Sequence, residues 1–165
     1  MQKSPTTRTI APSTTGKPKP IAQLKLHQET IAGKKVVLVV ADVESDRRHD
    51  SFADMTGLCM PTVSLLPISW LDFLKALPAL DADIIFICST SYGQDGFGTL
   101  RGDLKAFRGR NPKAVVALAN APLAHNPLQS LHSSNLLDHV DRHDVFSIPF
   151  LLKGVEVFVR RQELQ

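Results

Sequence analysis

The sequence has few of the residues that mark secreted, metal-binding or membrane proteins. Among its 165 residues are two cysteines, Cys59 and Cys88, one tryptophan and one tyrosine. Two cysteines make neither a disulfide framework nor a zinc-finger pattern, so we expect a reducing, cytoplasmic environment. The sequence also lacks a run of about 18 apolar residues and an apolar signal core at its N-terminus, which predicts no membrane span and no secretion.

Charge of one sign is not in large excess either. The formal net charge is +3, and much of the surplus lies in residues 1–25, which contain no aromatic residue. Proteins that bind single-stranded nucleic acid usually combine basic with aromatic residues. The sequence therefore indicates nucleic-acid contact only indirectly, through a partner or another domain. A nucleic-acid-associated regulatory adaptor stays open as an alternative, with the basic tail as its support.

The N-terminal part is rich in Pro, Thr, Ser and Lys. Such a segment buries too little apolar surface to offset the entropy lost on ordering. We therefore expect residues 1–32 to be a disordered tail or linker, and residues 33–165 to form the folded domain.

In the folded part, apolar segments alternate with amphipathic ones. Segments that are apolar without alternation are typical of strands inside a parallel sheet covered by helices. The predicted strands are Val36–Ala41, Cys59–Leu66, Ile84–Cys88, Lys113–Ala119 and Val145–Ile148. The predicted helices are about Glu44–Gly57, Trp70–Leu77, Thr99–Phe107, Pro127–Val140 and Leu151–Leu164. This alternation predicts a flavodoxin-like, doubly wound α/β fold with five parallel strands in the order 2-1-3-4-5.

Local signals position two of these helices. Ser69 is a suitable N-cap for the helix that starts at Trp70, and we expect that helix to direct Leu71, Leu74 and Leu77 inward. In the next helix the spacing of three apolar residues predicts a buried face. These are Leu100, Leu104 and Phe107.

Residues 89–98 contain three glycines and follow a central strand. They are expected at the carboxyl edge of the sheet, where open α/β folds bind ligands. Four segments then occur at a consistent spacing. They are Lys34–Asp42, a strand with an acidic end; Gln94–Phe97, followed by Leu100 and Leu104; Asn111–Leu118, a turn into a strand; and Ile148–Phe150, an Ile-Pro-Phe turn before the last helix. In this order the segments resemble the receiver domain of two-component response regulators, over nearly all of Lys34–Leu164.

The resemblance fails at the positions that would handle phosphate. By its spacing, the phosphate-accepting aspartate falls on Cys88, the switch hydroxyl on Ala119 and the lysine on Ile148, while Asp42 alone remains of the acidic pair. Phosphoryl transfer needs a carboxylate nucleophile, a metal held by acidic oxygens and nearby cations. The resemblance thus implies a non-catalytic pseudo-receiver, with no metal or cofactor.

By the same resemblance, such domains work in signal transduction and transcription regulation through protein contacts. The implied partner is another protein or a second copy, as a homodimer. The expected contact face combines the fourth helix, fifth strand and fifth helix, with Leu136, His139, Val157 and Arg161 as candidate contacts.

A flavodoxin-like FMN site is the competing hypothesis. Ser89, Thr90, Tyr92 and Gly93 resemble a loop that wraps a flavin, with Tyr92 stacking on the ring. The turn after the first strand argues against FMN because its three carboxylates, Asp42, Glu44 and Asp46, would repel a phosphate.

Two histidines suggest a metal site. His139 and His143 are four residues apart, and Asp138, Asp141 and Asp144 lie around them. This spacing is compatible with zinc ligation, but the polar run indicates a solvated loop instead.

Overall fold

A computed structural model describes residues 20–40, 60–88, 97–119, 131, 134–141 and 147–164. Its helices are α1 (Pro20–Leu26), α2 (Gln28–Ile31), α5 (Trp70–Ala76), the 3-10 helix η3 (Leu77–Ala79), α6 (Phe97–Arg110) and α8 (Ile148–Glu163). Its strands are β1 (Lys35–Val40), β2 (Ser64–Ser69), β3 (Ile84–Cys88), β4 (Val115–Ala119) and β5 (His139–Val140). Within this part of the chain, no helix is long and apolar enough to cross a membrane.

The five strands form one parallel sheet in the order β2-β1-β3-β4-β5. This confirms the predicted flavodoxin-like topology. Each central strand is buried on both faces because its side chains alternate between two apolar layers.

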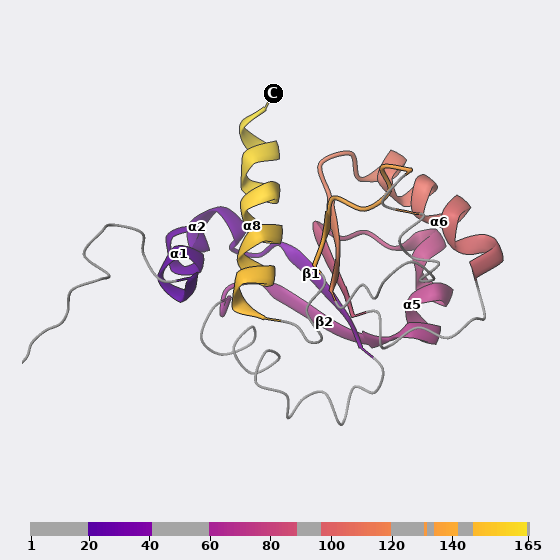
Figure 1. Cartoon of the computed structure of the whole chain (residues 1–165), viewed down its shortest axis with the longest axis horizontal. Helices are drawn as coiled ribbons and strands as arrows, with labels where there is room; N and C mark the ends of the chain where they lie inside the picture. The colour runs from indigo at the N-terminus through magenta and orange to yellow at the C-terminus, as the bar shows by residue number, and fades with distance from the viewer. Residues whose placement is uncertain are drawn as a thin grey trace, which may run out of the picture.

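The two layers contain different helices (Figure 1). Val36, Leu38 and Phe86 point to the layer that contains α8, and Val37, Val39 and Ile85 point to the layer that contains α5 and α6. The sheet therefore separates α8 from α5 and α6.

Ser69 and Ser147 are the N-cap residues of α5 and α8. The Ser69 hydroxyl accepts from the Asp72 N–H at 3.3 Å, and the Ser147 hydroxyl accepts from the Phe150 N–H at 3.2 Å. The first cap confirms the predicted start of α5. The predicted inward face of α5 was wrong in one respect, since Leu71 is 57% exposed and α5 buries Trp70 and Phe73 instead.

The fifth strand is not where the sequence indicated. Ile148 is the first residue of α8, whereas β5 is His139–Val140, inside the segment predicted as a helix. Backbone bonds fix this pairing: the Asp138 N–H donates to the Val116 carbonyl (2.7 Å), and the Asp141 N–H donates to the Leu118 carbonyl (2.8 Å). Both the predicted strand at Ile148 and the helical assignment of His139–Val140 were therefore wrong.

Strand β2 forms one edge of the sheet and contains Pro67. The Ser64 N–H donates to the Lys34 carbonyl at 2.8 Å, so the N–H groups of Ser64, Leu66 and Ile68 face β1. The nitrogen of Pro67 then lies on the outer side of the edge, where proline is tolerated because it removes no bond to β1. The sequence had placed the end of this strand at Leu66, one residue before the proline.

The segment before β1 is folded from residue 20 onward. Leu24 of α1 and Ile31 of α2 are fully buried in the layer that contains α8. Figure 1 shows α1 and α2 beside α8. Residues 20–32 are therefore packed against the domain; residues 1–19 and the helix predicted at 44–57 lie outside the described residues.

Candidate functional site

The carboxyl edge of the sheet brings two of the predicted site positions together. Cys88 ends β3 and pairs in register with Ala119, which ends β4 and is buried. The register of β1 and β3 places Val39 beside Ile87, one residue before this edge. Two adjacent strands therefore end here in a cysteine and an alanine, neither of which carries a carboxylate.

Other predicted site residues lie elsewhere. Ile148 is in the first turn of α8 and packs partly buried against the α8 layer, so it does not end a strand. Several residues fall outside the described part of the chain: Asp42 and the candidate flavin-loop residues Ser89, Thr90, Tyr92 and Gly93.

The four candidate contact residues have different environments. Leu136 is buried with the α5 and α6 layer, which leaves it little surface for a partner. His139 stacks on Phe150 with ring centroids 5.6 Å apart. Val157 is partly buried on α8. Arg161 makes an internal ion pair.

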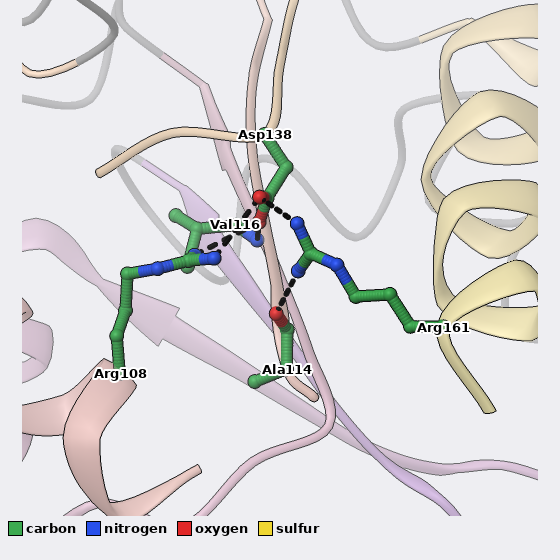
Figure 2. Close-up of polar contacts among 5 residues, drawn as sticks. All are labelled: Arg108, Ala114, Val116, Asp138 and Arg161. Atoms are coloured by element: carbon green, nitrogen blue, oxygen red, sulfur yellow. Dashed lines mark hydrogen bonds and ion pairs between the residues drawn. The ribbon is translucent and has the colours of Figure 1, made fainter. Parts of the chain in front are cut away.

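This ion pair belongs to a cluster of three charged residues, shown in Figure 2. Arg108, near the end of α6, donates to the two carboxylate oxygens of Asp138 from Nη1 (2.8 Å) and Nη2 (3.0 Å). Arg161, near the end of α8, also donates to Asp138 and to the Ala114 carbonyl. We call Arg108, Asp138 and Arg161 the amino-edge clamp.

The backbone of β4 completes the environment of Asp138. The Val116 N–H donates to Oδ2 of Asp138 at 2.8 Å. Burial raises the pKa of this carboxyl, but the hydrogen bonds from Arg161, Arg108 and Val116 outweigh burial and hold the pKa below its usual value. Asp138 is therefore a carboxylate that is only 7% exposed and is saturated with donors.

The clamp lies at the opposite edge of the sheet from Cys88 and Ala119. Asp138 precedes β5, and the two arginines come from helices in different layers. A carboxylate with this many donors has little capacity left for proton transfer or metal binding, so its effect is to hold α6, β5 and α8 together.

Sequence reasoning missed the clamp. It assigned Asp138 to a solvated loop beside His139, and Arg161 to a contact face. The solvated-loop interpretation was wrong for Asp138 and His139, which are partly buried. The ion pairs join residues 30 and 23 positions apart, and no local pattern reports such a contact. In the described ranges, no group of three or more His, Cys, Asp or Glu residues could hold a metal ion.

Neither the family models nor the curated proteins give a match to the chain. Solved structures do. A CheY-like response regulator receiver domain protein from Methanospirillum hungatei JF-1 superposes with a TM-score of 0.56 at 12% identity, over 81% of this chain and 100% of that one. The chain has the fold of a CheY-like receiver domain.

Two further structures agree with this receiver-like domain. A receiver domain protein from Clostridium thermocellum matches with a TM-score of 0.52 at 13% identity, over 79% of this chain and 98% of that one. A structure described as an adenylate cyclase from Rhodopirellula baltica matches with the same TM-score and identity, over 80% and 96%. At such identities the likeness concerns the fold.

Proposed function

We propose that this receiver-like domain acts in cytoplasmic signal transduction by binding a protein partner or a second copy, without phosphorylation and without catalysis of its own. The observation that carries the proposal is the pairing of Cys88 with Ala119 at the carboxyl edge. The fold supports the signalling role, and the chemistry of this edge supports independence from phosphate.

Phosphoryl transfer to a protein needs an oxygen nucleophile and charges that stabilise the transferred group. A thiol at position 88 does not form an aspartyl phosphate, and the methyl group of Ala119 cannot donate a hydrogen bond to a phosphoryl oxygen. The shape of the receiver fold then remains as the means of recognition.

The contact surface that we propose is the exposed side of α8 together with β5. Lys153 and Arg160 are exposed on α8, and Val157 lies between them in sequence. Arg161 instead stabilises the fold through Asp138, and Leu136 is buried. We therefore keep His139 and Val157 in the proposed surface and add Lys153 and Arg160.

The phosphate part of the proposal is tested by incubating the chain with acetyl phosphate or beryllofluoride and Mg²⁺. We expect an unchanged intact mass and no change in the tryptophan fluorescence of Trp70. Stoichiometric formation of a phosphoaspartate would overturn it.

The contact part is tested by size-exclusion chromatography with light scattering over a range of concentrations. Where the chain dimerises, Lys153→Glu combined with Arg160→Glu should weaken the dimer by ten-fold or more. Lys105→Glu, at an exposed position on α6, is the matched control and should leave the dimer unchanged. A dimer that is insensitive to the α8 substitutions would exclude this surface.

A further inference from the structure

Residues 20–31, which we call the N-terminal strap, pack against the rest of the domain through two aliphatic side chains. Leu24 and Ile31 are seven residues apart and fully buried, whereas Leu26 between them is 73% exposed. Leu24 belongs to α1 and Ile31 to α2, two short helices that meet at His27. The strap thus presents one apolar face to the domain and leaves the other in solvent.

The surface under the strap belongs to the layer that contains α8. Both α1 and α2 contact α8. The buried cluster that contains Leu24 and Ile31 also contains residues of β1 and α8, together with Met60, which precedes β2. We call the α8 part of this cluster, which includes Leu151, Leu152, Val155 and Phe158, the strap site. These α8 residues are buried, whereas Lys153 and Arg160 of the contact surface proposed above are exposed. Val157 packs against the same buried cluster, so the strap site adjoins that contact surface.

The strap depends on this docking for its shape. Helix α1 has seven residues and α2 has four, and the N-cap of α2, His27, makes no side-chain capping bond. Helices this short do not persist alone in water. Their conformation is therefore maintained by the surface on which they lie.

The polar connections at the end of the strap are few and local. The Thr62 hydroxyl donates to the Gln28 carbonyl at a long 3.4 Å, and the Gly33 N–H donates to the Thr62 carbonyl at 2.8 Å. Gly33 has φ +73°, a backbone conformation that glycine adopts without strain, directly between the strap and β1. The Lys34 N–H donates to the Ile31 carbonyl at 2.9 Å across this turn, so the strap and β1 are separate elements joined by a turn at Gly33.

We propose that the strap is an intramolecular occupant of a helix-binding site on α8, and that an amphipathic helix from a partner protein takes its place. The partner helix carries two aliphatic anchors seven residues apart, as Leu24 and Ile31 do. Recognition of an amphipathic helix by an apolar surface is a common mode of peptide binding. The covalently attached strap competes at a high effective concentration, so the site opens only to a partner that is abundant or binds tightly.

The test uses the full-length chain and a fluorescent peptide with the sequence of residues 20–32. The variant that carries Leu24→Ser and Ile31→Ser weakens the strap in cis. We expect this variant to bind the peptide saturably and at least ten-fold more tightly than the unmodified chain. The same peptide with both anchors replaced by serine should not bind.

The matched control is Leu26→Ser, which changes the exposed leucine of the strap. It should bind the peptide as weakly as the unmodified chain. A double variant that unfolds cooperatively but binds the peptide no better than the unmodified chain would overturn the proposal, as would equal binding of the serine peptide.

Where the double variant fails to fold alone, its response to the peptide decides the question. Recovery of a cooperative thermal transition on adding the peptide supports the helix-binding site. Absence of recovery at saturating peptide counts against it.

Discussion

Gly154 of α8 lies directly against the ring of Phe86 on β3. A Cβ atom built at position 154 would be 2.5 Å from Cε1 of Phe86, and Phe86 is itself fixed by an edge-to-face contact with Phe150. The helix can approach the sheet this closely because residue 154 has no side chain.

Gly154→Ala should therefore destabilise the protein by about 1–3 kcal/mol, since overpacking outweighs the better helix propensity of alanine. Gly102→Ala on α6 is the matched control, because a Cβ there meets no atom within 4 Å. The control should be neutral or stabilising by up to about 1 kcal/mol. Urea denaturation measures both, and a Gly154→Ala variant as stable as the unmodified chain would contradict the close packing.

Asp138→Asn should destabilise the protein because it leaves Arg108 and Arg161 without a carboxylate. Loss of one member of a buried ion pair costs about 3–5 kcal/mol. The arginine side chains are 18% and 28% exposed, so we expect the lower part of that range or somewhat less. Asp81→Asn, at an exposed site, should change the free energy of unfolding by less than about 0.5 kcal/mol. Equal effects of the two substitutions would show that the clamp contributes nothing specific.

The clamp also predicts an acid-sensitive stability. The pKa of Asp138 is lowered in the folded protein, so between the folded and unfolded pKa values the unfolded chain binds more protons. The stabilisation of the folded protein by the Asp138 carboxylate is therefore complete above the unfolded pKa of about 4, and it is lost as pH falls through the folded pKa. Urea denaturation between pH 7 and pH 2.5 should show that the free energy of unfolding falls more steeply for the unmodified chain than for Asp138→Asn. Parallel pH dependences of the two proteins would argue against a lowered pKa of Asp138.

Pro67 should protect the β2 edge from pairing with other chains. Pro67→Thr restores an N–H group on the outer side of an edge strand, next to the 46% exposed Leu66, and exposed edges with free donors promote association. We expect a larger apparent mass in light scattering at high concentration. Ile68→Val is the control, because it changes a neighbouring side chain of β2 and adds no N–H group to the outer side of the edge. Equal masses for Pro67→Thr and the control would contradict a protective role.

The sequence was sufficient to predict a buried parallel sheet because the three central strands are apolar on both faces. The strand order followed from the choice of a flavodoxin-like fold. A continuous apolar run such as Ile84–Cys88 can be recognised as a buried strand from the local sequence alone. The cap at Ser69 and the buried face of Leu100, Leu104 and Phe107 were predictable for the same reason: each depends on neighbours within one or two turns.

The features that sequence reasoning missed depend on distant partners. β5 has only two residues, too few for any periodicity, and its pairing is set by Val116 and Leu118. Half of the residues of the strap are polar, and its two anchors become informative only when α8 lies beside them. Of the candidate site, the sequence indicated the meeting of Cys88 and Ala119, but not the joining of Arg108 and Arg161 through Asp138.

The position of the clamp has a consequence for protein engineering. Because Asp138 fastens helices of both layers to β4 at the amino edge, these elements are joined to one another away from the carboxyl edge. Loops grafted after β3 or β4 would inherit a scaffold that is already held in register. The domain therefore offers a platform for installing new recognition loops, provided that its three charged residues are left intact.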